Sequence, residues 1–206
     1  MNDLPTSQQA EQMLCEAAAQ NPGPWVEHSR YCALAARQIA ANHPQMDAET
    51  AYTLGLLHDL GRYRGVFDLL HIVHGYDLLM ERGYPFAAQI SLTHSFPTQI
   101  AEHGKINWDG TDDQFAWLDD YLSQVEYTAY DRLIQLCDAL ALPQGFCLIE
   151  KRMVDVAMRR GIDQYTLIKW HKLYELKAEF ETAIGTSIYA VLPGVVETTF
   201  SNNHTA

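Results

Sequence analysis

The sequence predicts an all-α protein built as a single-domain helical bundle. Apolar residues recur at spacings of three, four and seven along successive segments, which is the periodicity of amphipathic helices. Glycine and proline punctuate the chain between these segments, as at Gly83, Pro85, Pro97, Gly104 and Pro143. No sustained alternation of β-branched and polar residues is present, so strands are expected to be absent or minor. The 206 residues are enough for one substantial hydrophobic core.

The helices follow from local start and stop signals. A long helix begins near Pro24, because proline is favoured at the first helical position, and it ends before Pro44. Asp47 is expected to cap the next helix, over about 48–58, with Thr50 as its third residue. The interior stretch 103–114 is the most loop-like. Further helices are predicted near 6–20, 71–82, 85–95, 113–123, 125–141, 146–160 and 164–184.

The chain is expected to consist of four consecutive parts. The segment 164–184 is amphipathic, and the residues at core-like spacing are Leu167, Trp170, Leu173 or Tyr174, and Phe180. We expect this segment to pack against the bundle or against a second subunit, and in the second case the protein would be a homodimer. The final residues lack periodicity. The four parts are an N-terminal helical extension over 1–20, a helical core over 21–145, C-terminal helices packed on that core over 146–192, and a flexible tail over 193–206.

Charge and composition restrict the partners. The 14 basic residues are outnumbered by 26 acidic ones, giving a formal net charge of -12, which repels nucleic acids and anionic membranes. A small anionic substrate held by a few local basic residues remains compatible with this charge. The four cysteines form no CxxC pair, the first ten residues are polar, and no run of about 18 apolar residues occurs. We therefore expect a cytoplasmic protein with no nucleic-acid polymer and no membrane as partner.

Polar side chains on the apolar helix faces are the anomaly of this sequence. Each one alone is explained as a hydrogen-bonded core residue, a helix cap or an ion-pair partner. Burying several of them together is costly unless a positive charge lies among them, and imidazole and carboxylate are the usual ligands of Mn, Fe, Co, Ni or Zn. We therefore expect one or two divalent transition-metal ions. The side chains on or beside the apolar faces are His28, His58, Asp59, His74, His94 and Asp138.

The order of four of these residues resembles a known signature. His28, then His58 with Asp59, then Asp138 resembles the H…HD…D pattern of the HD superfamily of metal-dependent phosphohydrolases. The resemblance covers about residues 24–142 and extends to the contexts "LLHDLGR" and "LCDAL". It implies a helical bundle of the HD-domain type that projects these four side chains onto a first metal ion.

The resemblance also implies a second ion. His74 and His94 stand between the HD pair and the final aspartate, where two-metal members carry further histidines. Asp59 would then bridge the two ions and be the catalytic residue, and Gly61 would let the backbone leave the helix beside the metal without a side chain in the way. The remaining histidines fall off the pattern or in loops and are left out of the site: His43, His71, His103, His171 and His204.

The implied activity is hydrolysis of a phosphoester or phosphoanhydride by metal-activated water, with a nucleotide or a related small phosphorylated metabolite as substrate. Arg62 lies just after the HD pair, where a basic residue could contact a substrate phosphate. The alternative interpretation is that Arg62 is a solvated cation stabilised by the helix dipole at the C-terminal end of the helix. Arg152 and Lys151 are a second candidate phosphate-binding cluster, or else part of a solvated helix face.

Two other functions fit the same residues. Some two-iron members of the superfamily, such as inositol oxygenase and a phosphonate-cleaving oxygenase, use six ligands in the order H…HD…H…H…D to activate dioxygen. Six such ligands are available here, so an HD-type dinuclear iron oxygenase acting on a small polar or phosphonate substrate is the alternative. The third hypothesis is a non-catalytic sensor that binds a nucleotide or metal and signals through a partner. The loss of one of the four HD ligands would favour a sensor, but all four residues are present.

Overall fold

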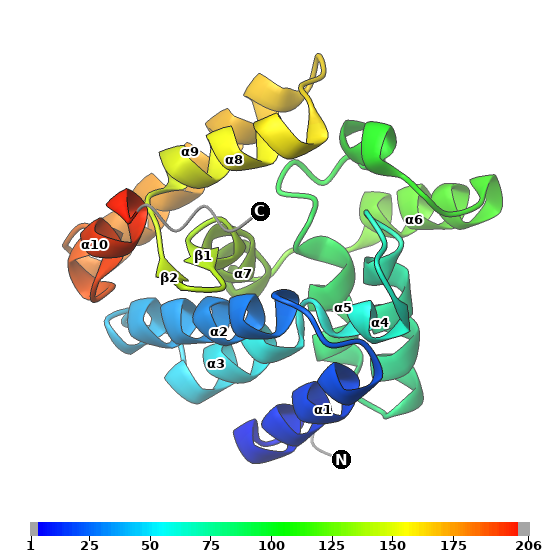
Figure 1. The fold of residues 1–206 in the computed structure, drawn as a ribbon, viewed down its shortest axis with the longest axis horizontal. Helices are drawn as coiled ribbons and strands as arrows, with labels where there is room; N and C mark the ends of the chain where they lie inside the picture. The colour runs from blue at the N-terminus through cyan, green and yellow to red at the C-terminus, as the bar shows by residue number, and fades with distance from the viewer. Residues whose placement is uncertain (1–3, 202–206) are drawn as a thin grey trace.

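The structure, a computed structural model, describes residues 4–201 and confirms the all-α fold class (Figure 1). Its α-helices are α1 (Ser7–Gln20), α2 (Trp25–Ala41), α3 (Ala48–Leu57), α4 (His71–Glu81), α5 (Pro85–Thr93), α6 (Asp112–Gln124), α7 (Ala129–Asp138), α8 (Ile149–Arg160), α9 (Thr166–Ile184) and α10 (Val195–Phe200). Short 3-10 helices are η1 (Leu60–Arg64), η2 (Ala101–Asn107) and η3 (Ile188–Val191). A two-stranded antiparallel hairpin, β1 (Ala141–Leu142) and β2 (Gly145–Phe146), follows α7.

Most helices begin and end close to the predicted residues, because their caps are local. Asp47 caps α3 as predicted, with its Oδ1 accepting a hydrogen bond from the Thr50 N–H at 2.7 Å. The helix predicted from 125 begins instead at Ala129, because Thr128 and Asp131 form a reciprocal capping box.

Two segments expected to be irregular contain helix. The predicted loop over 103–114 includes most of η2. The tail predicted over 193–206 contains α10, whose Val195 and Thr199 are buried. Thr199 Oγ1 accepts a hydrogen bond from the Leu148 N–H, so α10 is held by a contact with a distant part of the chain. Residues 202–206 of that tail lie outside the described residues.

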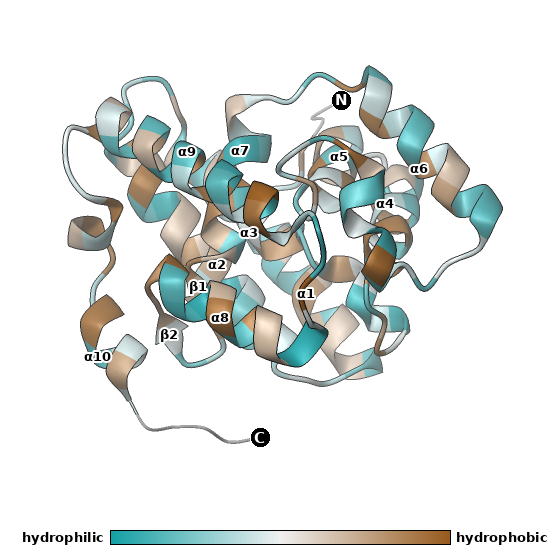
Figure 2. Cartoon of the chain, turned by 90° about the horizontal axis from the view of Figure 1, so that it is seen from above, coloured by the Kyte–Doolittle hydropathy of each residue, from teal (hydrophilic) through white to brown (hydrophobic). Residues whose placement is uncertain are grey.

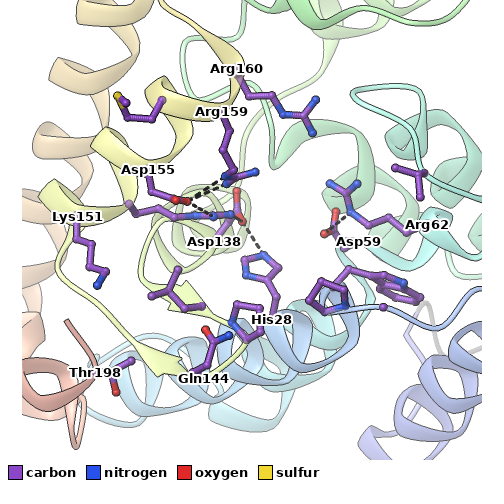
Figure 3. Close-up of a pocket in the computed structure, with 18 of the residues that line it drawn as sticks. His28, Asp59, Arg62, Asp138, Gln144, Lys151, Asp155, Arg159, Arg160 and Thr198 are labelled. Atoms are coloured by element: carbon purple, nitrogen blue, oxygen red, sulfur yellow. Dashed lines mark hydrogen bonds and ion pairs between the residues drawn. The ribbon is translucent and has the colours of Figure 1, made fainter. Parts of the chain in front are cut away.

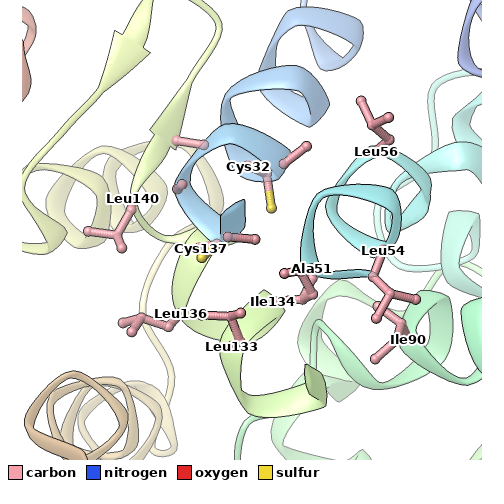
Figure 4. Packing of buried hydrophobic residues seen from close by; sticks show 14 of the residues in the cluster. Cys32, Ala51, Leu54, Leu56, Ile90, Leu133, Ile134, Leu136, Cys137 and Leu140 are labelled. Atoms are coloured by element: carbon pink, nitrogen blue, oxygen red, sulfur yellow. The ribbon is translucent and has the colours of Figure 1, made fainter. Parts of the chain in front are cut away.

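The central core lies where α2, α3 and α7 meet (Figure 4). Gly55 allows α2 and α3 to approach closely, since a Cβ at this position would stand 2.5 Å from the Cα of Ala33. Fully buried side chains such as Cys32, Leu54 and Ile134 fill the space between the three helices. The aliphatic run before His58 thus packs α3 against both neighbours and fixes the end of that helix.

A second close approach joins η1 to α4. A Cβ on Gly61 would stand 1.9 Å from the carbonyl oxygen of His71 and 2.3 Å from the nitrogen of Gly75. Gly61 does not adopt a positive φ, so its role differs from the expected exit from the helix. Its missing side chain lets the first turn of α4 lie directly against the turn that follows Asp59.

The C-terminal helices pack on this bundle. Phe180 of α9 joins the central core as expected, and Trp170 packs against it, but Leu167 is 65% exposed and Leu176 takes a core position instead. In Figures 1 and 2, α10 lies toward one end of the molecule, while α4 and α6 lie toward the other. Along α8, hydrophobic and hydrophilic residues alternate in Figure 2, and among them Ile149 and Met153 are buried. Between residues 4 and 201, no helix combines the length and apolarity needed to cross a membrane.

Candidate metal centre

Three predicted ligands meet where α2, α3 and α7 converge. His28 Nε2 of α2 lies 2.8 Å from Oδ1 of Asp138, the last residue of α7. His58, which directly follows α3, places its Nε2 4.0 Å from the same oxygen. One donor atom from each of the three residues lies within 4.8 Å of the others. Such a group could hold a metal ion.

A second group shares His58 with the first. His58 Nε2 lies 3.9 Å from Asp59 Oδ2, and His94 Nε2 lies 3.6 Å from Asp59 Oδ1. Donor atoms of these three residues again lie within 4.8 Å of one another. His94 follows α5, so four helices supply the two groups. The structure thus brings together five of the six ligands expected from the sequence.

His74, the sixth expected ligand, belongs to neither group. Its ring packs against Phe67 with 4.8 Å between ring centroids. His71 of α4 also belongs to neither group, but it reaches the cluster, with its Nε2 2.9 Å from Asp59 Oδ1. The cause is the close contact at Gly61, which packs against the face of α4 that carries His71 and Gly75, whereas His74 lies on a different face.

His71 fell outside the apolar pattern used to select inward-facing side chains. A different signal could have found it. His71 stands four residues before Gly75, so the two share one helix face. A Cβ on Gly75 would stand 2.1 Å from Ser91 Oγ, so this face is packed closely against α5 as well as η1. The glycine at position 75 therefore indicates that the face of α4 carrying His71 is the closely packed one.

The Nδ1 atoms of the cluster histidines face backbone carbonyls. The Nδ1 of His58 lies 2.7 Å from the Gly55 oxygen, and that of His94 lies 2.9 Å from the Ser91 oxygen. An N–H at Nδ1 donates to each carbonyl, so the lone pair of Nε2 points into the cluster. The backbone therefore holds these two rings in the tautomer that a metal ligand requires.

His28 and His71 each face two acceptors. The Nδ1 of His28 lies 3.2 Å from the Ala141 oxygen, while its Nε2 faces Asp138. The Nδ1 of His71 lies 2.7 Å from the Asp68 oxygen, while its Nε2 faces Asp59. A neutral imidazole has a single N–H for these two acceptors. With its N–H on Nδ1, His71 turns the Nε2 lone pair toward Asp59, and Arg62 Nη2, 3.3 Å away, can donate to that nitrogen. With its N–H on Nδ1, His28 offers its Nε2 lone pair to a cation beside Asp138.

The charges of the cluster favour a cation. Burial lowers the pKa of His58 and His71 and lowers that of His94 to about 3, so these rings are neutral near pH 7. Burial opposes the ionisation of Asp59, but the positive charge of Arg62 holds the pKa of this carboxyl well below its usual range. Asp138 is half-buried, and its contact with His28 keeps its pKa low. Two carboxylates thus lie among neutral imidazoles.

Unsatisfied atoms test whether the residues fit a metal ion. Within the described residues 4–201, His58 Nε2 and Asp59 Oδ1 are buried and have no hydrogen-bond partner. Buried polar atoms in this state are rare and costly. Both atoms belong to residue types that coordinate divalent transition metals, and both point into the cluster. The donor set therefore fits such an ion.

The two arginines proposed as phosphate ligands lie beside the cluster. Arg62 donates from Nε to Asp59 Oδ2 at 2.6 Å and from Nη1 to the Phe67 carbonyl at 3.1 Å. Arg152 Nη2 lies 3.8 Å from Asp138 Oδ1, and its Nη1 lies 3.6 Å from Asp155 Oδ2. Arg62 is therefore fixed by the chain itself, whereas Arg152 makes only longer contacts.

A cleft of about 1230 Å³ opens onto the cluster. Figure 3 shows His28 and Asp138 on one side of it and Asp59 with Arg62 on the other, with basic residues of α8 above them. Lys151 also lines the cleft, and its Nζ donates to the Thr199 carbonyl at 2.6 Å. The cluster is therefore reached through a cleft with many positive charges.

The fold and the cluster together define a class of protein, an α-helical domain with a buried His/Asp site suited to a divalent metal ion. The family model of the HD domain matches residues 25–142, more than half of the chain. The chain belongs to the HD domain family, which confirms the resemblance drawn from the sequence. Proteins of this family bind divalent metals and are generally metal-dependent hydrolases. No curated protein and no solved structure matched the chain.

Proposed function

We propose that the protein is a metal-dependent phosphohydrolase that cleaves a phosphoester or phosphoanhydride of a nucleotide or a related small phosphorylated metabolite. The observation that carries this proposal is the juxtaposition of two features. Imidazole nitrogens and carboxylate oxygens lie close together, and among the described residues His58 Nε2 and Asp59 Oδ1 have no hydrogen-bond partner. A cleft rich in basic side chains opens directly onto them. The first feature suits a cation, and the second suits an anionic substrate.

We assign the ligands as follows. A first ion is held by His28, His58, Asp59 and Asp138, as the resemblance to the family implies. For a second ion we keep Asp59 as the bridging residue and His94, and we replace His74 by His71, because His71 contacts Asp59 and His74 does not. A divalent ion in such a site lowers the pKa of bound water and polarises a phosphoryl oxygen.

The chain's own residues orient the substrate. Arg152 stands beside Asp138 with little of its side chain exposed, so its guanidinium can bind a phosphoryl oxygen next to the cluster. Arg62 fixes the Asp59 carboxylate through Oδ2 and leaves Oδ1 without a donor. We therefore assign Arg152 as a phosphate ligand, and Arg62 as a residue that positions Asp59 and adds positive charge to the cleft wall.

Apolar residues of the cleft support an organic substrate. Val66 is 96% exposed and Met158 is 83% exposed, and both line the cleft. Val154 and Phe200 add to this exposed apolar surface. An aromatic or aliphatic group of a small metabolite would cover part of it, whereas inorganic phosphate would not. A nucleobase is one group of this kind.

The test is a phosphate-release assay over a panel of nucleotides and phosphorylated metabolites, with Mn²⁺, Co²⁺ or Ni²⁺ and without oxygen. We expect anaerobic phosphate release that a chelator stops and added metal restores. Turnover that requires dioxygen, together with a mixed-valence iron EPR signal, would contradict hydrolysis and support the dinuclear iron oxygenase.

A further inference from the structure

Basic residues concentrate on the cleft of a chain that is acidic overall. More than a third of the 14 lysines and arginines line this single cleft, although the chain carries 26 acidic residues. Such a concentration produces a local positive potential that attracts anions. Figure 3 shows most of these residues above the cluster, on α8. The basic residues of the cleft are Arg62, Lys151, Arg152, Arg159 and Arg160.

Nearby carboxylates offset only part of this charge. Asp155 accepts hydrogen bonds from Arg159 at 2.9 and 3.2 Å and also lies 3.6 Å from Arg152, so one carboxylate serves two guanidinium groups. Asp68 pairs with Arg160. If Asp59 and Asp138 bind metal, these two pairs leave an excess of three positive charges. A single phosphate monoester does not neutralise that excess.

Arg160 and Arg62 add a second observation. Burial lowers the pKa of Arg160, and the positive charge of Arg62 lowers it further, which means that the two guanidinium groups repel each other. In Figure 3 Arg160 extends from α8 above the cluster, and Arg62 stands beside Asp59. Arg62 is paired with Asp59 and Arg160 with Asp68, and an anion bound between the two guanidinium groups would contact both of them.

The spacing along α8 extends the basic surface beyond one phosphate. Arg152 lies beside Asp138, and Arg159 and Arg160 follow seven and eight residues later on the same helix. At a rise of about 1.5 Å per residue, these positions are roughly 11 Å apart along the helix axis. One phosphate group is too small to contact both ends of this surface.

We propose that Arg159 and Arg160 form a second phosphate subsite, so that the substrate carries two or more linked phosphates, as a nucleoside diphosphate or triphosphate does. This inference rests on the proposed function and specifies its substrate class. The phosphoryl group that reacts lies at the cluster beside Arg152, and the further phosphates extend along α8 toward Arg160.

Kinetics on matched substrates test the subsite. We compare kcat/KM for the triphosphate and the monophosphate of the same nucleoside in the wild type, Arg160→Ala and Arg159→Ala. We expect the wild type to prefer the triphosphate, and each variant to lower that preference by about tenfold, as for the loss of one charge-assisted hydrogen bond. Arg132→Ala is the control, because Arg132 is an exposed arginine paired with Glu179 outside the cleft. An unchanged preference in both cleft variants would overturn the subsite.

Direct binding separates this inference from the proposed function. Imidodiphosphate, whose P–N–P bond resists hydrolysis, and methylphosphonate are titrated calorimetrically into the protein as purified. We expect imidodiphosphate to bind more tightly, and Arg160→Ala to weaken it about tenfold while Arg132→Ala does not. If this holds but no substrate is hydrolysed, the subsite stands and the proposed function fails. If monophosphates are hydrolysed and Arg160→Ala leaves imidodiphosphate binding unchanged, the proposed function stands and the subsite is overturned.

Discussion

At the scale of single residues, the cluster is defined by which nitrogen of each imidazole faces it. Backbone carbonyls at Gly55 and Ser91 fix the His58 and His94 rings. The sequence identified these histidines because each follows a helix whose apolar face points to the core. The apolar pattern did not select His71, because the position of that side chain depends on how closely α4 approaches η1 at Gly61, a contact that only the glycine at position 75 on the same helix face indicates in the sequence.

Removing the Asp59 carboxylate tests its assigned role. Asp59→Ala should lower metal affinity by at least about 100-fold and abolish hydrolysis, because the carboxylate lies at the centre of the cluster. Helicity should be preserved, since the side chain does not belong to the hydrophobic core. Elemental analysis, an activity assay and circular dichroism measure the three properties. Normal turnover by this variant would show that Asp59 has no catalytic role.

The two histidines of α4 provide a matched pair. His71→Ala should weaken binding of a second metal ion about 10- to 100-fold, because it removes a nitrogen 2.9 Å from Asp59 Oδ1. His74→Ala should leave metal binding within about twofold, because that ring packs against Phe67. Metal titrations followed by calorimetry distinguish the two variants. The opposite order would restore His74 as the ligand.

At the scale of elements, local signals predicted most helices, and contacts between distant segments account for the rest. The Asp47 cap needs only its own backbone turn, so the sequence revealed it. The helix α10 has six residues and is held by the contact of Thr199 with Leu148, which no local pattern contains. The cleft could not be predicted from local patterns either, because its walls come from helices that are distant in the sequence.

Gly61 is the element-scale feature that places His71. Gly61→Ala should destabilise the fold by about 1–3 kcal/mol and weaken metal binding, because the new Cβ would collide with the backbone of α4. Gly83→Ala is the control. Its positive φ makes an alanine costly, by about 1–2 kcal/mol, but no atom lies within 4 Å of the new Cβ. Urea denaturation and metal titration should show stability loss in both variants and weaker metal binding only in Gly61→Ala. Unchanged metal binding in Gly61→Ala would contradict the account.

The Asp47 cap has a pH-dependent effect. Asp47→Ala should cost about 1 kcal/mol near pH 7, because the first turn of α3 loses an acceptor. Its hydrogen bond from the Thr50 N–H lowers the pKa of Asp47 in the folded protein. The contribution is therefore present above about pH 3.9, the pKa of an unfolded aspartate, and is lost as the pH falls through the lower folded value. Urea denaturation of both proteins at several pH values measures this. A difference that grows toward low pH would contradict the assignment.

At the scale of the whole molecule, a net charge of -12 coexists with a basic cleft over a buried acidic cluster. The sequence predicted the overall charge and most of the cluster, since both follow from residue types and helix periodicity. It assigned Lys151 and Arg152 only as candidates and did not single out Arg159 or Arg160. Their place in the cleft depends on the position of α8 above the cluster, which no local pattern contains (Figure 3).

The metal content of the purified wild-type protein, measured by elemental analysis and followed by titration with Mn²⁺, Co²⁺, Ni²⁺, Fe²⁺ and Zn²⁺, tests the central claim most directly. We predict one or two equivalents of a divalent transition metal per chain, either present on isolation or taken up in the titration, and loss of the first of them in Asp138→Ala. A protein that is isolated without metal and takes up none of these ions would contradict the account.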